Sequence, residues 1–325
     1  MAPRKGNIMS YRPDIKVVDA TIRDGGLVND FYFTDEFVKK LYETNVKAGV
    51  DYMEFGYKAS TDVFDEDKFG KWKFCKEEDI RAIVGDNDTN LKISVMADVG
   101  RTNLERDIID KKDSVIDIVR VATYINTIPA AIDMAEYCHN KGYETSINIM
   151  AISTAGENDI RQALDLICQS DGVDMVYMVD SYGAIYPEEM SKLCDLFCEY
   201  GQKYGKVIGV HAHDNQKLAF ANTIEAVSRG ASMLDATVCS LGRGAGNCAM
   251  EALIGFLKNP RYRLDPILRF IQTEMLKLRE TTVWGYDIPY LITGQLNMHP
   301  RTAINFIKEG DTDYSELYQE LWTRE

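Results

Sequence analysis

The stretch Val207-Ile-Gly-Val-His-Ala-His-Asp-Asn215 is a short β-branched run that ends in two histidines and a polar turn. An amphipathic pattern precedes it over residues 187–204 and another follows it over 216–229, each with apolar residues at helical spacing. Pro187 stands at a helix start, where its missing N–H costs nothing. The stretch therefore predicts a strand between two helices, which is the repeating unit of a parallel sheet.

The same alternation runs along most of the chain. Helical patterns occur, for example, at 35–48, 128–140, 159–170, 187–204 and 216–229. Short apolar runs with turn residues at their ends predict eight strands, at 16–22, 52–55, 92–96, 116–122, 144–151, 174–179, 207–212 and 233–238. Eight strand–helix units favour closure into a barrel, because an open doubly wound sheet usually has fewer strands.

The predicted fold class is α/β, a (β/α)8 TIM barrel with a C-terminal helical extension. We expect the barrel, as the catalytic domain, over residues 1–258, because such barrels span about 250 residues. Residues 259–325 show further helical patterns, at 264–280, 289–297, 302–308 and 314–322. We expect this extension to pack over the barrel mouth rather than to form an independent domain.

Charge and composition exclude several classes of protein. The chain of 325 residues has 37 Lys and Arg against 51 Asp and Glu, a net charge of −14, which disfavours nucleic-acid binding. Its charge-free apolar stretches are far shorter than the about 18 residues that span a bilayer, and the first residues lack the apolar segment of a secretory signal. Seven cysteines include no Cys-x-x-Cys pair, so we expect reduced thiols in a cytoplasmic protein.

Polar residues at two predicted strand ends form the candidate site, since barrel active sites lie at the carboxyl ends of the strands. Arg23 and Asp24 follow the first strand, and His211 and His213 are two apart on the seventh, so both imidazoles point to one face. Two imidazoles and a carboxylate predict a divalent-metal site open to substrate, with Mn²⁺, Mg²⁺, Zn²⁺, Co²⁺ or Fe²⁺ as candidates. The alternative is a pair of hydrogen-bonded core histidines.

The loop Leu241-Gly-Arg-Gly-Ala-Gly-Asn247 follows the last predicted strand. Glycines before a helix can hold an anion, as barrel phosphate sites do, or can simply form a tight turn. Arg243 and Asn247 are candidates to face the metal centre. Asn247 is also a good helix cap.

Five motifs, in this order, resemble the metal-dependent lyase and synthase superfamily called the DRE-TIM metallolyases. They are Asp19-Ala-Thr-Ile-Arg-Asp-Gly25, Val119-Arg-Val-Ala-Thr123, Val179-Asp-Ser-Tyr-Gly183, His211-Ala-His-Asp-Asn215 and Gly242-Arg-Gly-Ala-Gly-Asn247. Members of the superfamily include 3-hydroxy-3-methylglutaryl-CoA lyase, isopropylmalate and homocitrate synthases, and 4-hydroxy-2-oxovalerate aldolase. The short glycine loop and the helical tail are most similar to the aldolase branch.

The resemblance implies a set of site residues. Asp24, His211 and His213 would hold the metal, with Mn²⁺ as the expected ion and Mg²⁺, Co²⁺ or Zn²⁺ as alternatives. Arg23 would be the catalytic arginine. Tyr286 resembles a tyrosine that reaches over the aldolase site, and its alternative is an aromatic tail residue that packs on the barrel. The predicted substrate-binding residues are Glu54, Arg120, Ser181 and Asn247.

Three positions depart from the patterns of the relatives. Leu27 replaces the histidine that would take the substrate hydroxyl proton, Tyr124 replaces a second histidine, and Gly26 replaces a synthase glutamate. The metal and arginine residues are kept while the acid–base groups are changed, so we expect another base, with Tyr286 favoured. The other candidates are Glu54, Tyr57, Tyr124 and a metal-bound hydroxide.

The predicted function is a divalent-metal-dependent carbon–carbon lyase, an aldolase that acts on a 2-oxo acid through a metal-stabilised enolate, with pyruvate as product or nucleophile. One alternative is an acyl-CoA-dependent Claisen-type synthase, which would release thiol from acetyl-CoA in the presence of 2-oxo acids. Another alternative is a non-catalytic family member. Leu27 favours this alternative, whereas the intact Arg23 and metal residues argue against it. The expected partners are a small-molecule 2-oxo acid, further copies of the chain or a dehydrogenase, and neither nucleic acid nor membrane.

Overall fold

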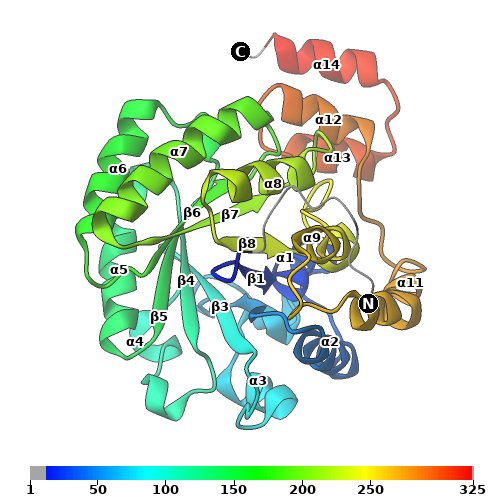
Figure 1. The fold of residues 1–325 in the computed structure, drawn as a ribbon. Coiled ribbons are helices and arrows are strands. Elements are labelled where there is room, and N and C mark those ends of the chain that lie inside the picture. Colours follow the sequence, from blue (N-terminus) through cyan, green and yellow to red (C-terminus); the bar gives the residue numbers. More distant parts are fainter. Residues whose placement is uncertain (1–11, 324–325) are drawn as a thin grey trace.

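The computed structural model describes residues 12–323 and contains parallel strands that close into an eight-stranded barrel (Figure 1). Each strand pairs with the next along the chain, and β8 pairs with β1, where Lys16 lies opposite Met233 and Asp19 opposite Ala236. The strands are β1 (Lys16–Asp19), β2 (Tyr52–Tyr57), β3 (Lys92–Asp98), β4 (Ile118–Thr123), β5 (Glu144–Ile149), β6 (Met175–Asp180), β7 (Val207–Ala212) and β8 (Met233–Ala236).

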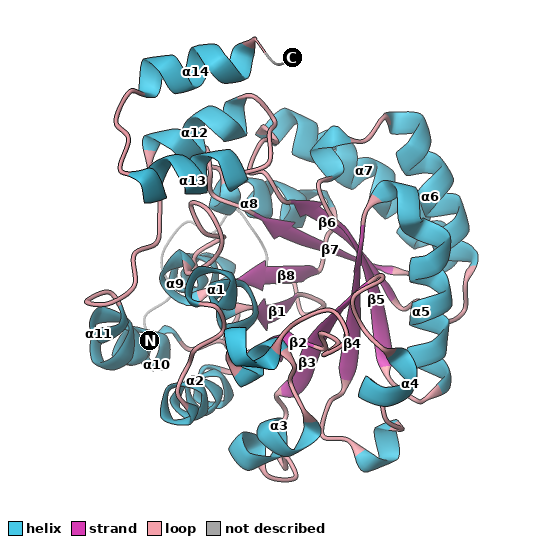
Figure 2. Ribbon diagram, turned by 180° about the vertical axis from the view of Figure 1, so that it is seen from behind, coloured by secondary structure: helices cyan, strands magenta, loops and turns pink. Residues whose placement is uncertain are grey.

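Helices lie between the strands and form a layer around the barrel, as Figure 2 shows. The predicted fold class, an α/β barrel of the TIM type, is confirmed. The helices of this layer are α1 (Thr21–Asn29), α2 (Asp35–Ala48), α3 (Glu77–Val84), α4 (Leu104–Asp107), α5 (Ile128–Asn140), α6 (Glu157–Gln169), α7 (Pro187–Tyr204), α8 (Ala219–Arg229) and α9 (Met250–Leu257). Among the described helices, none is both long and apolar enough to span a membrane.

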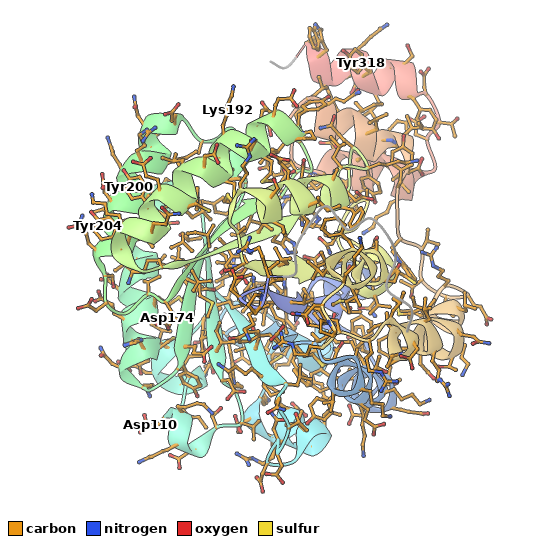
Figure 3. All side chains as sticks on the ribbon, viewed as in Figure 1. Asp110, Asp174, Lys192, Tyr200, Tyr204 and Tyr318 are labelled. Atoms are coloured by element: carbon orange, nitrogen blue, oxygen red, sulfur yellow. The ribbon has the colours of Figure 1, made fainter. Side chains whose placement is uncertain are left out.

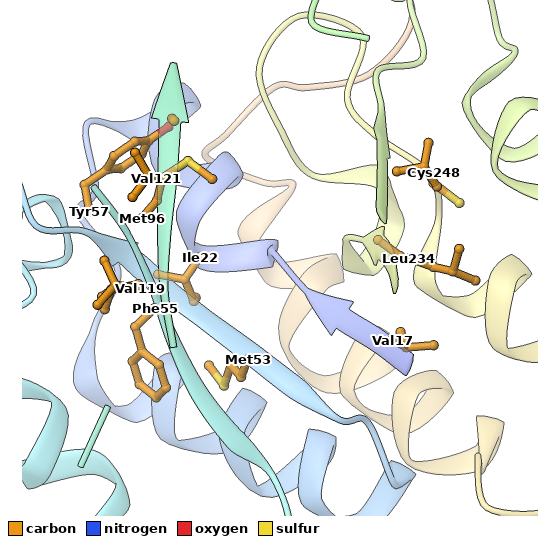
Figure 4. Packing of buried hydrophobic residues seen from close by; sticks show 14 of the residues in the cluster. Val17, Ile22, Met53, Phe55, Tyr57, Met96, Val119, Val121, Leu234 and Cys248 are labelled. Carbon is orange, nitrogen blue, oxygen red and sulfur yellow. The ribbon is translucent and has the colours of Figure 1, made fainter. Parts of the chain in front are cut away.

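Apolar side chains on the two faces of the strands form two clusters, because successive residues of a strand point to opposite faces. The larger cluster includes Val17, Met53 and Phe55 of β1 and β2 (Figure 4). The smaller cluster consists of Val18, Tyr52, Ile118, Met175, Tyr177, Val179 and Met233.

Polar and aromatic side chains project from the outer surface, for example Lys192 on α7 and Tyr318 near the C-terminus (Figure 3).

The first strand is shorter than the pattern predicts. We expected a strand over 16–22, but β1 ends at Asp19 and the chain continues into α1. The Asp19 carboxylate accepts a hydrogen bond from the backbone N–H of Thr21 at 2.9 Å, which helps to turn the chain. Arg23 and Asp24 therefore lie at the start of a helix. Two glycines concealed this helix in the sequence, because glycine is a poor helix former.

The C-terminal segment consists of two parts. The first continues the outer helix layer: the ring of Phe270 on α10 (Leu264–Phe270) lies 5.2 Å from the ring of Phe37 on α2. A π-helical turn (Ile271–Met275) joins α10 to α11 (Leu276–Leu278) and interrupts the helix predicted at 264–280. The second part has its own apolar cluster and is seen at the top of Figure 1. It consists of α12 (Ile288–Gln295), α13 (Arg301–Glu309) and α14 (Tyr314–Trp322).

Candidate metal centre

Asp24, His211 and His213 meet at the carboxyl end of the barrel strands. The Nε2 atom of His211 lies 3.4 Å from Asp24 Oδ2, and the Nε2 atom of His213 lies 3.9 Å from the same oxygen. One ligand atom from each residue lies within 4.8 Å of the other two, and all three side chains are buried. This spacing fits one divalent ion with three protein ligands and further positions open to substrate.

Burial and neighbouring charges put two of the three ligands, His213 and Asp24, in the protonation states that a metal needs. Burial lowers the pKa of His213 to about 3, so its ring is neutral at neutral pH. Burial alone would raise the pKa of Asp24, but the Arg23 guanidinium holds it well below its usual value. A neutral imidazole and a charged carboxylate are the forms that coordinate a divalent ion.

The hydrogen bonds of His211 leave one ring nitrogen for a metal. Its Nδ1 atom lies 3.0 Å from Asp235 Oδ2, while its buried Nε2 atom has no hydrogen-bond partner of good geometry among the described residues. A carboxylate on one ring nitrogen fixes the tautomer and directs the other nitrogen to the metal. An unpaired buried nitrogen is costly without a ligand, so the donor set fits a divalent ion. Asp235 was not predicted from the sequence, although it is the only acidic residue within the short apolar strand β8.

Arg23 connects the ligand carboxylate to two acidic residues inside the barrel. Its guanidinium donates to Asp24 and, through Nε, to Glu54 Oε2 at 2.7 Å. Its Nη2 atom lies 3.8 Å from Asp235 Oδ2. Burial opposes a charge on Arg23, but Glu54 and Asp24 raise the pKa of the guanidinium well above its usual value. Arg23 is therefore a fixed cation beside the metal ligands.

Glu54 and Arg120 support the centre and do not line the cavity that opens on it. Arg120 donates from Nη1 to Glu54 Oε2 at 3.0 Å and from Nη2 to Asp235 Oδ2 at 2.7 Å. Its guanidinium lies 4.4 Å from the centre of the Tyr177 ring. Both residues are fully buried. This placement differs from the substrate-binding role that we predicted, because the charges of Glu54 and Arg120 are used to hold Arg23 and Asp235.

The glycine loop 241–247 approaches Asp24 with its backbone. The N–H of Arg243 donates to Asp24 Oδ1 at 2.8 Å, and a Cβ atom at Gly242 would come within 2.6 Å of the same oxygen. Glycine is required for so close an approach. Asn247 is buried beside Gly242 and does not cap a helix, because α9 begins beyond it. It also does not line the cavity, where we expected it to bind substrate.

A cavity with an empty volume of about 390 Å³ opens on the metal ligands. Arg23 and Arg243 supply cations to its wall, and Ser181 and Asn148 supply neutral polar groups. Tyr57 also lines it, and burial raises the pKa of Tyr57, so its phenol is protonated. A small cavity with two cations suits a small anionic substrate. Its apolar wall consists of Leu27, Met96, Ala122, Met150 and Val179.

Comparison with known proteins identifies the family. The HMGL-like family model matches residues 14–280. The chain belongs to the HMGL-like family. The resemblance to the DRE-TIM metallolyases is thereby confirmed.

Two curated relatives and one solved structure show which proteins this HMGL-like protein is similar to. It is 28% identical over 275 residues to oxaloacetate decarboxylase from Mycobacterium tuberculosis, over 83% of this chain and 79% of the relative. It is 32% identical over 246 residues to 4-hydroxy-2-oxovalerate aldolase 3 from Rhodococcus jostii, over 74% of this chain and 70% of the relative. Its fold matches the N-terminal domain of a candidate aldolase from Bacteroides vulgatus with a TM-score of 0.75 and 26% identity, over 90% of this chain and 96% of that one.

Tyr286 of this HMGL-like protein does not line the metal-facing cavity. It is 38% exposed, and its ring centre lies 3.8 Å from Lys217 Nζ. Tyr286 lines a second cavity, which shares Leu27 with the first. Tyr124 lies beyond the end of β4, is 45% exposed and is also outside the metal-facing cavity. Of the tyrosines considered as bases, Tyr57 is the one on its wall.

Proposed function

We propose that this chain is a divalent-metal-dependent carbon–carbon lyase, an aldolase that cleaves a 2-oxo acid with pyruvate as product or nucleophile. The observation that carries the proposal is that three metal-ligand side chains and the Arg23 guanidinium meet in one small cavity. Curated relatives named oxaloacetate decarboxylase and 4-hydroxy-2-oxovalerate aldolase support it, because both names specify a 2-oxo acid.

A divalent ion held by Asp24, His211 and His213 would supply Lewis-acid stabilisation of negative charge on the keto oxygen of a 2-oxo acid. We propose Mn²⁺ as the ion, because imidazole and carboxylate ligands with open positions suit it. Mg²⁺, Co²⁺ and Zn²⁺ are the alternatives, and metal analysis of the purified protein distinguishes them.

Arg23 would stabilise the enolate. Its guanidinium is held by Asp24 and Glu54 before substrate arrives, so it need not reorganise as charge develops on the keto oxygen. We propose that Arg243, the second cation on the wall, pairs with the substrate carboxylate. We propose that Ser181, which also lines the cavity, hydrogen-bonds a remaining substrate oxygen.

Proton transfer is the step at which this chain differs most from the aldolase pattern. Leu27 occupies the position of the expected base, and Tyr286 lines the second cavity. Tyr57 is a protonated phenol on the wall of the metal-facing cavity. We therefore propose that Tyr57 donates a proton to C3 of the pyruvate enolate and recovers it from solvent water.

Decarboxylation is a second candidate function, and the leucine at position 27 favours it. A retro-aldol step must remove a hydroxyl proton, whereas an ionised carboxylate on C3 leaves as CO₂ without a base. The cations, metal ligands and Tyr57 on the cavity wall would suffice for that reaction. A curated relative carries the name of such an enzyme, oxaloacetate decarboxylase.

We also propose that the protein is cytoplasmic and acts with further copies of itself or with a dehydrogenase. Its seven cysteines include no Cys-x-x-Cys pair, which suits a reducing compartment. The partners are proposed from the resemblance to the aldolase branch. Light scattering tests self-association, and copurification tests a dehydrogenase.

Separate assays with oxaloacetate and a 4-hydroxy-2-oxo acid test the proposed function, with pyruvate followed through a coupled dehydrogenase. Cleavage of the hydroxy acid supports the aldolase, and cleavage of oxaloacetate alone supports the decarboxylase. His213→Ala at the same metal concentration corrects for catalysis by free metal. Thiol release from acetyl-CoA with 2-oxo acids would instead support the Claisen-type synthase. No turnover by the metal-loaded protein would support a non-catalytic role.

A further inference from the structure

A second, larger cavity adjoins the metal-facing one and has no part in the chemistry above. Its empty volume is about 910 Å³. The end of α1, the loop after β8, residues 283–287 and the helices α12 and α13 form its wall. These segments are far apart in the sequence, and Figure 2 shows α12 and α13 above α1. The cavity therefore lies between the barrel mouth and the C-terminal helices.

Leu27 and Arg243 line both cavities, so the two cavities adjoin at these residues. Arg243 is fixed there, because its backbone N–H donates to Asp24 and its Nη2 donates to the carbonyl of Ser181 at 2.9 Å. Leu27 is 37% exposed at this junction. A substrate that binds at the metal ligands and is longer than pyruvate would cover Leu27 and extend into the second cavity.

The wall of the second cavity is mainly apolar and aromatic. Its charged lining residues are Arg243 at the junction, Lys308, which is exposed, and Asp287, whose Oδ1 accepts from the N–H of Ile288 at 2.7 Å. The rest of the wall suits an apolar group rather than a charged one. Besides Leu27, the apolar and aromatic lining residues are Val28, Val283, Trp284, Tyr286, Tyr290, Ile304 and Ile307.

We propose that the second cavity binds the substituent that the substrate carries on C4, beyond the C3–C4 bond that breaks. The inference rests on the proposed aldolase function and names its substrate class, which is 4-hydroxy-2-oxo acids with a large apolar or aromatic substituent. In cleavage, the electron pair of the C3–C4 bond passes to the pyruvate fragment as an enolate. The C4 hydroxyl loses its proton to solvent water, and C4 leaves as an aldehyde in the second cavity. A decarboxylation would not need this cavity, because its leaving group is CO₂.

Aldol addition of pyruvate to two aldehydes tests the proposal. Wild-type protein should show a kcat/KM at least about tenfold higher for phenylacetaldehyde than for acetaldehyde, because only the aryl group reaches the apolar wall. Ile307→Trp, which places a large ring in the cavity from α13, should lower the ratio of the two kcat/KM values at least about tenfold.

Two further variants serve as a replacement for Ile307→Trp and as a control. Val283 lines the cavity and is 92% exposed, so Val283→Trp replaces Ile307→Trp if the latter does not fold. Leu268 on α10 is 50% exposed and lies outside both cavities. Leu268→Trp is therefore the matched control and should keep the wild-type ratio.

Exchange of the C3 protons of pyruvate with deuterium, measured without aldehyde, distinguishes failure of this inference from failure of the proposed function. If wild type adds both aldehydes to pyruvate without preference, or if neither Ile307→Trp nor Val283→Trp changes the ratio, the inference is overturned and the aldolase stands. If wild type does not exchange, or exchanges but adds neither aldehyde, the proposed aldolase function falls and the inference with it. Thiol release from acetyl-CoA that is lost in Ile307→Trp would assign the cavity to a coenzyme A arm and also overturn the inference.

Discussion

Asp235→Asn tests how the metal centre is held. Asp235 Oδ2 lies 3.0 Å from His211 Nδ1 and 2.7 Å from Arg120 Nη2. The amide keeps the shape and an acceptor oxygen for His211, but it removes the negative charge that makes the imidazole a better ligand. Loss of such a supporting carboxylate typically weakens metal binding by about 10- to 100-fold, which corresponds to about 1.4–2.7 kcal/mol.

The same substitution should also lower the free energy of unfolding. Removing one partner of a buried ion pair costs about 3–5 kcal/mol when the other charge is left uncompensated. Arg120 is 1% exposed, but Glu54 still accepts from it at 3.0 Å. We therefore expect the lower end of the range, about 3 kcal/mol, and a variant that still folds.

Competition with a fluorescent chelator measures the dissociation constant for Mn²⁺ in wild type and variant. Asp51→Asn is the matched control, because Asp51 is also buried and bonded to an arginine, Arg261, but precedes β2 at the opposite end of the barrel. It should lower stability without changing metal affinity. If folded Asp235→Asn binds Mn²⁺ as tightly as Asp51→Asn does, Asp235 does not support the metal centre.

Three other predictions concern single side chains. Arg23→Lys should keep Mn²⁺ binding but lower kcat about 10²-fold, because lysine lacks the guanidinium fork; a normal kcat with a raised KM would limit Arg23 to substrate binding. Tyr57→Phe should slow pyruvate C3 exchange about 10²-fold, more than Tyr286→Phe does, and the reverse order would return the acid–base role to Tyr286. Burial raises the pKa of Asp180 to about 7, so from about pH 4 to 7 the native state keeps a proton that the unfolded state has lost. In urea titrations with chelator, the free energy of unfolding should fall as pH rises through that window, and Asp180→Asn should reduce the fall; equal slopes would refute it.

The barrel and the three metal-ligand candidates could be predicted from sequence because both depend on short-range patterns. Strand and helix periodicities reveal the alternating units, and the alternation of side chains along a strand puts His211 and His213 on one face. The helix that carries Asp24 was missed, because adjacent glycines hide helical periodicity. Asp24 nevertheless follows the first strand closely in the sequence, and this was enough to predict that it lies in the site.

Features that depend on long-range contacts could not be predicted. Asp235 meets His211 only because β8 pairs with β7 as the barrel closes. The charge of Arg120 suits substrate binding, but in the fold its guanidinium forms ion pairs with Glu54 and Asp235 instead. The second cavity depends on where α12 and α13 lie against the barrel, which a helical pattern does not specify.

Exchange of the C3 protons of pyruvate with deuterium, followed by mass spectrometry, tests the central claim most directly. That claim is that Asp24, His211 and His213 hold a divalent ion that lets this chain form an enolate. We predict exchange in the metal-loaded wild type, its loss with a chelator, its return when metal is restored, and none in His213→Ala at the same metal concentration. Absence of exchange in the metal-loaded wild type, or equal exchange in wild type and His213→Ala, would contradict the claim.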